Sequence, residues 1–243
     1  MNLQMRAAAP SALYRRQKVI AVLTAVLLLI GSLSFARMMS PEKQPVIALL
    51  QRPALVIDPG HGGVDGGAIA YNGVKESELN LQICLKLQAL AEFCGVHPVM
   101  TRQDENLASN LTSYSEREDL AYRASLAEAA GGVLISVHQN TFPTSQPTGA
   151  QVLYGAGEDS RRLGELTHRN LLQALQPENR RVAAPAPSNL YLTSHVSCPA
   201  ILVECGFLSN LSDLQRLSDG RYQSSLALIL LASYLQFTDT AGA

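Results

Sequence analysis

The chain has 243 residues and a formal net charge of −1 at pH 7, with 19 Lys and Arg against 20 Asp and Glu. This length suits one domain with short additions. Beyond the first twenty positions the basic residues are dispersed, which excludes the basic stripe typical of nucleic-acid-binding proteins. Tryptophan is absent, so we expect an aliphatic core.

The N-terminal segment differs from the rest of the chain. Cationic residues at positions 15–18 precede an apolar run over residues 19–36, which is near the lower length limit for crossing a bilayer. The cationic flank predicts a cytoplasmic leader over residues 1–18 and export of everything that follows. The run is either a membrane anchor or a cleaved signal peptide, since residues 34–36 have the small-x-small form of a cleavage site. The long charged leader favours the anchor, and both alternatives place the protein in the cell envelope, outside the cytoplasm.

After the apolar run the sequence predicts a linker and then one folded domain. Residues 37–53 contain three prolines that discourage regular structure, and residues 54–238 alternate between strand and helix patterns. The predicted strands are 55–58, 97–101, 133–137, 151–154 and 200–203, and the predicted helices are 76–93, 115–130, 160–175 and 222–237. Continuous apolar strands that alternate with helices predict an α/β sandwich with a mostly parallel sheet. Residues 177–188, rich in Pro and Ala, are predicted to be a surface loop.

The four cysteines are Cys84, Cys94, Cys198 and Cys205. They do not form the C-x-x-C pattern of a metal site. An exported domain permits disulfides, and one bond between a helix and a strand stays open as an alternative. We expect four free, mostly buried thiols.

Side chains that can bind a metal or transfer a proton lie at the ends of three of the predicted strands. In open α/β sheets, sites collect at the carboxyl ends of the strands. His61, His138 and Glu204 all follow or end such strands, and Glu76 joins them if the helix after the glycine loop begins over the same edge. Two histidines and one glutamate with an open position form the ligand set of a catalytic zinc site. Glu204 is then left as the general base.

Each of these residues has a simpler interpretation when taken alone. His61 is compatible with a turn residue, His138 with a hydrogen-bonded core histidine, and Glu76 with a carboxylate favoured by a helix N-terminus. Glu204 directly follows three apolar residues, so its burial must be offset, which favours a functional role. We favour the joint site because all four residues fall where one site would need them.

The glycine-rich stretch 60–67 is not a phosphate-binding loop. The third glycine position of G-x-G-x-x-G holds Asp65, and no G-K-[ST] follows. We expect the glycines to let the backbone fold tightly enough to present His61 to a metal. Asp65 either orients His61 from behind or only holds the turn. His195, in the loop before the last strand, is a weaker candidate for lining the cleft.

Taken together, the motifs resemble the zinc-dependent N-acetylmuramoyl-L-alanine amidases, over residues 55–237. The segments that carry the resemblance are I-D-P-G-H-G-G-V-D-G-G-A, K-E-S-E-L-N-L, T-R-Q-D, L-I-S-V-H-Q-N and L-V-E-C-G-F-L-S-N. The resemblance implies a three-layer, zinc-exopeptidase-like fold with a six-stranded sheet. It implies hydrolysis of the amide bond between the lactyl group of N-acetylmuramic acid and the L-alanine of the peptidoglycan stem peptide.

The resemblance also implies the roles of individual residues. His61, Glu76 and His138 occupy the zinc-ligand positions, and Glu204 occupies that of the catalytic glutamate. Glu78 is a rival for the ligand role, but the spacing to the following asparagine favours Glu76. Gln139 and Cys205 depart from the residues that many relatives carry.

A finer similarity is to the single-domain spore-cortex and germination amidases. In that subgroup the amidase removes the stem peptide, and a partner deacetylase then allows muramic δ-lactam to form. The expected partners are peptidoglycan, the membrane through the N-terminal segment, and a protein activator or deacetylase. One alternative is a carboxypeptidase of the same fold, in which Arg102 and Arg123 would bind a terminal carboxylate. Another is a catalytically inactive wall-binding module.

Overall fold

The structure, a computed structural model, describes residues 52–109 and 114–240. The predicted leader, the apolar run at 19–36 and nearly all of the predicted linker lie outside these residues. Among the helices that are described, none is both long enough and apolar enough to cross a membrane.

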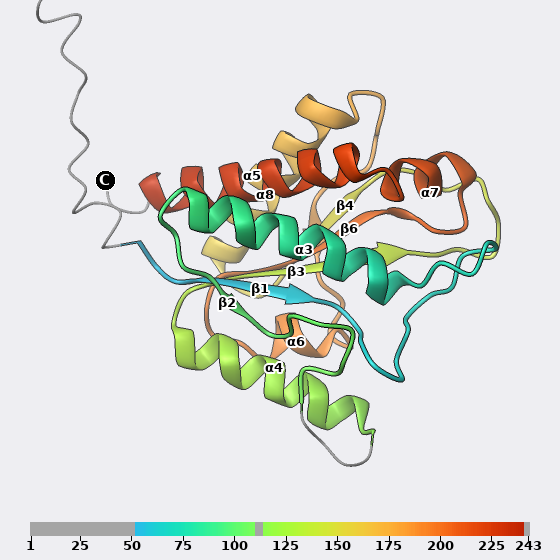
Figure 1. Ribbon diagram of the computed structural model, residues 1–243. Coiled ribbons are helices and arrows are strands. Elements are labelled where there is room, and N and C mark those ends of the chain that lie inside the picture. The colour runs from blue at the N-terminus through green and yellow to red at the C-terminus, as the bar shows by residue number, and fades with distance from the viewer. Residues whose placement is uncertain (1–51, 110–113, 241–243) are drawn as a thin grey trace, which may run out of the picture. The chain divides into compact units, whose positions relative to one another are not determined.

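A mixed sheet, six-stranded within the described residues, forms the middle layer of the fold (Figure 1). Its strands are β1 (Leu55–Pro59), β2 (Val99–Met100), β3 (Val133–Asn140), β4 (Gln151–Tyr154), β5 (Ala184–Pro185) and β6 (Ala200–Phe207). The strand order is β2-β1-β3-β6-β4-β5, and every neighbouring pair is parallel except β4 with β6. The prediction of a mostly parallel sheet is therefore confirmed. The short strand β5 was predicted as part of a loop, because two residues carry no apolar pattern.

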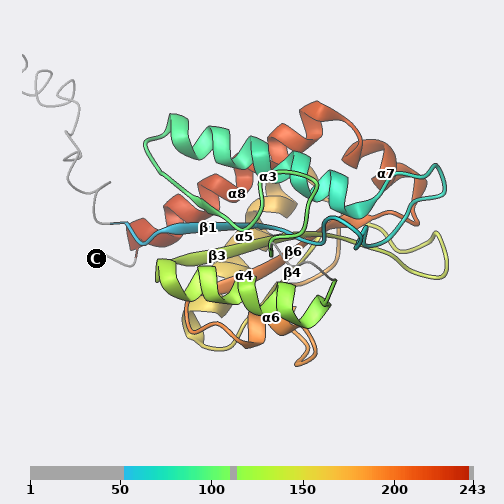
Figure 2. The same ribbon diagram turned by 60° about the horizontal axis from the view of Figure 1, so that its bottom comes forward.

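Helices cover both faces of the sheet and complete the predicted three-layer α/β sandwich. They are α3 (Glu76–Phe93), α4 (Glu116–Ala130), α5 (Glu158–Leu175), α6 (Tyr191–Ser194), α7 (Leu211–Leu217) and α8 (Gly220–Thr240). Helices α3, α5 and α8 lie on one face, and α4 and α6 lie on the other (Figures 1 and 2). The four long helices were predicted to within three residues at each end. The short helices α6 and α7 were not, because one or two turns show too little periodicity.

Alternation along the strands divides the core into two. Odd-numbered residues of β1 and β3, such as Ile57 and Ile135, pack with α3 and α8 in the larger cluster. Even-numbered residues such as Val56 and Leu134 pack with Ala127 of α4 in the smaller cluster. The even-numbered side chains therefore face α4 and α6, and this is also the face of the sheet on which the polar residues emerge.

The parallel register lines up the polar residues near the carboxyl edge of the sheet. Asp58 of β1 pairs with Ser136 of β3, which pairs with Leu202 of β6. Two residues further along, His138 pairs with Glu204. Because residues two apart on a strand face the same side, these residues form two successive rows that lead to the edge of the sheet.

All four cysteines are free, as predicted. Cys84 and Cys205 are buried, Cys198 is half-buried and Cys94 is exposed. The expectation that most of them would be buried is therefore met only for two.

Candidate active site

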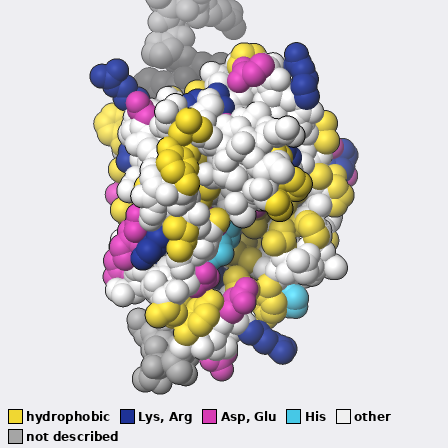
Figure 3. All heavy atoms as spheres, turned by 90° about the vertical axis from the view of Figure 1, so that its right-hand side faces the viewer, with side chains coloured by type: hydrophobic (Ala, Val, Ile, Leu, Met, Phe, Trp, Pro, Cys, Tyr) yellow, Lys and Arg dark blue, Asp and Glu magenta, His cyan; other side chains and the backbone are white. Residues whose placement is uncertain are grey.

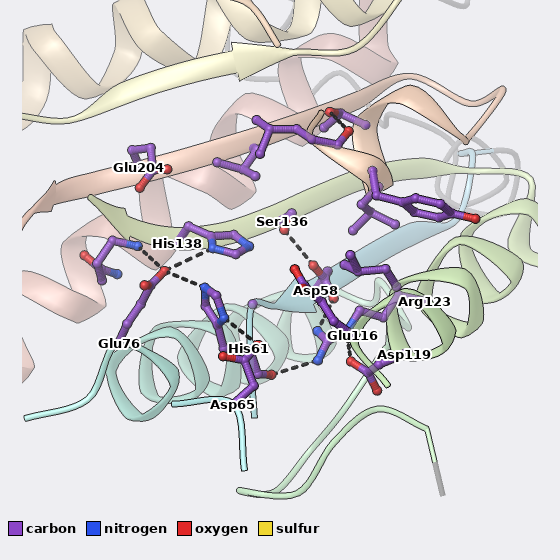
Figure 4. A pocket seen from close by; sticks show the side chains of 18 of the residues that line it. Asp58, His61, Asp65, Glu76, Glu116, Asp119, Arg123, Ser136, His138 and Glu204 are labelled. Carbon is purple, nitrogen blue, oxygen red and sulfur yellow. Dashed lines mark hydrogen bonds and ion pairs between the residues drawn. The ribbon is translucent and has the colours of Figure 1, made fainter. Parts of the chain in front are cut away.

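The three predicted metal ligands converge at the carboxyl edge of the sheet (Figure 4). Glu76 Oε1 lies 3.3 Å from His61 Nε2 and 3.0 Å from His138 Nδ1. One ligand atom from each residue lies within 4.8 Å of the other two. The glutamate comes from the first turn of α3, so the helix begins over this edge as predicted. Two imidazoles and a carboxylate without a thiolate match the donor set of a catalytic zinc ion.

The glycine loop makes room for these side chains. A Cβ at Gly60 would lie 2.2 Å from Nε2 of His138, and a Cβ at Gly67 would lie 2.7 Å from Glu76 Oε2. His61 itself has a φ of 61°, and it is the one non-glycine residue of the described chain with a positive φ. Such a conformation is uncommon for a residue with a side chain and persists where its surroundings fix it. The glycines predicted a tight loop, but nothing in the sequence indicated that His61 would take the left-handed conformation.

Asp65 holds both the histidine and the turn. Its Oδ2 lies 2.8 Å from His61 Nδ1, and its Oδ1 accepts a hydrogen bond of 3.1 Å from the backbone N–H of Gly67. If Nδ1 carries the proton and donates it to Asp65, the lone pair of Nε2 faces Glu76 and the ligand position. Asp65 therefore contacts both His61 and the turn, and the choice between an orienting role and a purely structural one stays a prediction.

Hydrogen bonds keep Glu76 as a carboxylate. Its two oxygens accept from the backbone N–H groups of Ala68 and Gln139, at 2.9 and 3.0 Å. Burial favours the neutral acid, but the hydrogen bonds and charges of His138 and His61 hold the pKa of Glu76 well below its usual range. Burial likewise opposes the charged form of His61, yet Glu76 and Asp65 raise its pKa to about 9. This cluster strongly attracts positive charge.

Glu204 faces the cluster from β6, on the strand next to His138 (Figure 4). Its Oε2 atom is buried and has no hydrogen-bond partner among the described residues. Burial raises the pKa of Glu204 to about 7, against the attraction of the nearby His138. A carboxyl group with such a pKa can take up and release a proton near neutral pH, as a general base requires.

The two arginines proposed for carboxylate binding are not available for it. Arg102 and Arg123 are only 4% and 1% exposed. Arg123 donates to Asp58 at 2.7 Å and to Asp119 at 2.7 Å, and both arginines donate to backbone carbonyls. Their contacts with β1 could not be read from the sequence, because they join segments that lie 43 to 65 positions apart in the chain.

A cleft of about 350 Å³ joins the cluster to the α4 face of the sheet. The row of Asp58, Ser136 and Leu202 lines it beyond His138 and Glu204. Its walls come from α4 and from residues 189–193. The space-filling view shows histidine surface, in cyan, within a hollow bordered by hydrophobic and acidic side chains (Figure 3).

His195 is absent from the cleft lining, so the suggestion that it lines the cleft is wrong. Its exposed ring stacks on Tyr191, with ring centroids 3.8 Å apart, and it is Tyr191 that reaches the cleft. The short helix α6, which no sequence pattern predicted, therefore supplies part of the wall.

Comparison with known proteins identifies the family. The profile described as N-acetylmuramoyl-L-alanine amidase (Amidase_3) matches residues 55–232. The chain belongs to this amidase family. It is 31% identical over 194 residues to the germination-specific N-acetylmuramoyl-L-alanine amidase of Bacillus subtilis, covering 77% of this chain and 81% of that protein. It is 32% identical over 188 residues to the amidase LytC of the same organism, covering 76% of this chain but only 34% of LytC.

Solved structures of amidases share the fold. The CwlD amidase of Clostridioides difficile, solved in complex with the GerS lipoprotein, superimposes with a TM-score of 0.69 at 28% identity, covering 78% of this chain and 100% of that one. The amidase AmiC2 of Nostoc punctiforme gives a TM-score of 0.65 at 28% identity, covering 76% of this chain and 97% of that one. Cell-wall amidases act on peptidoglycan, so family membership implies action outside the cytoplasm.

Proposed function

We propose that this amidase uses zinc to hydrolyse the bond between the lactyl group of N-acetylmuramic acid and the L-alanine of the stem peptide. One observation carries the proposal. His61, Glu76 and His138 converge in a cleft that Glu204 also lines, and Oε2 of Glu204 is buried with no hydrogen-bond partner among the described residues. The donor set fits zinc, because it combines nitrogen and carboxylate ligands and leaves a position open for substrate or water.

In the proposed reaction, the metal ligands, Glu204 and Asp65 have separate roles. When bound by His61, Glu76 and His138, zinc supplies Lewis-acid stabilisation of the negative charge on the amide oxygen and eases deprotonation of water. Glu204 takes the proton of the attacking water and passes it to the amine of the departing L-alanine. Its pKa of about 7 allows both transfers. Asp65 keeps Nε2 of His61 turned toward the ligand position through its contact with Nδ1.

Two alternatives are disfavoured by specific contacts. A carboxypeptidase needs a cation that can reach the terminal carboxylate of its substrate, whereas Arg102 and Arg123 are buried and donate to partners within the protein. An inactive wall-binding module would be expected to lack a ligand or the base, and here all four groups are present and face one cleft.

Product analysis tests the proposal. Purified protein should release stem peptides with a free N-terminal alanine from peptidoglycan, detected by mass spectrometry of the soluble and muropeptide fractions. Chelation should stop the release, and added zinc should restore it. Release of single C-terminal amino acids instead would identify a carboxypeptidase, and full activity after complete metal removal would refute the zinc site.

We further propose that the enzyme is held at the membrane by residues 19–36 and acts in spore-cortex maturation. The apolar run with its cationic flank supports the anchor. The similarity to a germination-specific and a sporulation-specific amidase supports the cortex role. Cortex peptidoglycan treated with this enzyme and a muramic acid deacetylase should gain muramic δ-lactam, and treatment with either enzyme alone should not. Fractionation of cells that express the full chain checks the anchor.

An activator or deacetylase partner also belongs to this proposal, and the CwlD–GerS complex supports a protein partner in general terms. Turnover by the purified chain alone, compared with turnover after addition of envelope extract, measures whether an activator is needed.

A further inference from the structure

Arg102 is a buried cation without a carboxylate partner. Arg102 lies just after the short edge strand β2 and is 4% exposed. It takes part in none of the ion pairs of the described chain. Burial lowers its pKa, and repulsion from the nearby Arg123 lowers it further. A buried charge is costly unless hydrogen bonds replace its hydration. The partners that offset this cost therefore indicate what the residue does.

Those partners are four backbone carbonyls. Nε donates to Pro59 O at 2.9 Å, and Nη1 donates to Asp104 O at 2.7 Å. Nη2 donates to Gly60 O at 3.0 Å and to Ser77 O at 2.9 Å. One guanidinium thus joins the end of β1, the first turn of α3 and the loop after β2.

Two of these carbonyls are adjacent to the metal-site residues. Gly60 directly precedes His61, and Ser77 directly follows Glu76. A single Nη2 atom therefore links the segment that carries the first histidine to the segment that carries the glutamate. Asn80 of α3 also donates to Gly60 O, at 3.1 Å, but Arg102 alone among the side-chain hydrogen bonds of the described residues joins the carbonyls of Gly60 and Ser77 through one atom.

A second arginine completes the arrangement on the other side of the histidine. Arg123 donates to Pro59 O at 2.8 Å and to His61 O at 2.7 Å. The carbonyls of Pro59, Gly60 and His61 are therefore all held by guanidinium groups. With the carbonyls before and after it fixed, His61 is kept in its left-handed conformation, which would otherwise relax.

We propose that Arg102 is a positioning residue of the metal site, which sets the placement of His61 relative to Glu76 and thereby raises the affinity for zinc. This inference rests on the proposed zinc-dependent function. The planar guanidinium offers five N–H donors in a fixed geometry, so it can reach carbonyls in several directions at once. A lysine ammonium keeps the charge but cannot donate hydrogen bonds to all four carbonyls at once.

The test compares two arginine-to-lysine variants. Arg102→Lys keeps the charge and removes the bridge between the two segments. Arg52→Lys is the matched control, because Arg52 also holds a carbonyl, that of Leu235 at 3.1 Å, but makes its contacts with the C-terminal helix rather than with the metal site. Both are made in the full chain, and circular dichroism confirms folding at the assay temperature.

Zinc affinity is measured by competition with a chromophoric chelator. Arg102→Lys should bind zinc about 10- to 100-fold more weakly than the unchanged protein, which is the range seen when outer groups of a metal site are altered. Arg52→Lys should bind zinc normally even if its melting temperature falls. Cobalt substitution provides a second measurement, because the visible spectrum of the cobalt form should change in Arg102→Lys and not in Arg52→Lys.

The outcomes separate this inference from the proposed function. If the unchanged protein does not bind zinc, the proposed function fails and this inference fails with it. If the unchanged protein and Arg102→Lys bind zinc equally and give the same cobalt spectrum, only the positioning role is overturned. Arg102→Gln, which retains two amide donors, is the second variant. If both variants stay unfolded in excess zinc, Arg102 is a residue of the core, and the positioning role is likewise overturned.

Discussion

Two clusters of charged residues border the same cleft, and they differ in how completely their members are paired. In the first, Asp58 accepts hydrogen bonds from Thr101, Ser136 and Arg123, at 2.6, 2.6 and 2.7 Å. Arg123 is also bonded to Asp119. In the second, around Glu76, the histidines share one carboxylate, and Glu204 has a buried oxygen with no partner among the described residues.

This difference separates scaffold from chemistry. The paired cluster keeps its carboxylate charged. Burial favours the neutral form of Asp58, but Arg123 and the hydroxyl groups of Ser136 and Thr101 lower the pKa of Asp58 to about 2. The pKa of the unpaired Glu204 shifts in the opposite direction, because burial raises it to about 7. Asp58, which stays ionised among fixed partners, holds the fold, whereas Glu204, whose pKa lies near neutrality, can transfer protons; Glu76 stays ionised as well, but as a candidate metal ligand.

The largest effect is expected at the unpaired carboxyl. Glu204→Gln keeps the shape of the side chain but removes its ability to take a proton, so kcat should fall about 100- to 10,000-fold. Zinc should remain bound, because the three ligands are unchanged, and metal analysis of the dialysed variant checks this. Glu78→Gln makes the same chemical change on α3 outside the cleft lining and should leave kcat intact. Substantial turnover by Glu204→Gln would remove Glu204 from the mechanism.

The next largest effect is expected in the paired cluster. Arg123→Met leaves Asp58 and Asp119 without their cation, and breaking a buried ion pair by removing one partner costs about 3–5 kcal/mol. Urea denaturation of the metal-free protein measures the free energy of unfolding. The double variant Arg123→Met with Asp58→Asn should recover part of the loss, because the unpaired charge is then also removed. A loss no greater than that of Arg161→Ala, at an exposed ion pair on α5, would contradict the scaffold role.

A third prediction concerns acid stability. Because the pKa of Asp58 falls from 3.8 to about 2 on folding, its contribution to stability is complete above the unfolded value and is lost as the pH falls toward 2. A shift of this size corresponds to about 2 kcal/mol. Denaturation of metal-free protein at a series of pH values below 5 should therefore show a steeper decline than in Asp58→Asn. Parallel pH curves for the two proteins would show that Asp58 is not held ionised by the fold.

The same comparison explains how much could be predicted from the sequence. The long helices and the apolar strands followed from periodicity, because the burial of one face or both faces is written in the order of the residues. His61, His138 and Glu204 could be placed at one edge because carboxyl ends of parallel strands meet there. Glu76 required the further assumption that α3 starts over that edge, which the structure bears out.

The arginine contacts could not be predicted in this way. Arg102 and Arg123 each have one local partner, Asp104 and Asp119, but their contacts with the strand, the glycine loop and α3 span 25 to 65 positions of the chain, and no local pattern encodes those partners. In the carboxypeptidase alternative, Arg102 and Arg123 are the candidates for binding a terminal carboxylate, and their burial argues against that role. The short helix α6 was missed for a related reason, since its place in the wall of the cleft depends on packing against α4 rather than on its own four residues.

The smallest effect is expected at Asp65, which has hydrogen-bond partners like the first cluster but contacts a residue of the second. It contacts His61 as an outer carboxylate, yet its side chain is 28% exposed, so water can take over part of its role in a variant. Asp65→Ala should therefore lower zinc affinity about tenfold, at the weak end of the range for such groups, and change kcat little once zinc is saturating. Asp104→Ala, in the neighbouring loop, is the matched control: its carboxylate also accepts from a backbone N–H two residues on, but it does not touch a histidine. If both variants weaken zinc binding equally, Asp65 acts only by holding the turn. If Asp65→Ala alone weakens zinc binding, the carboxylate orients His61, and the metal site extends beyond its three ligands to the surface of the glycine loop.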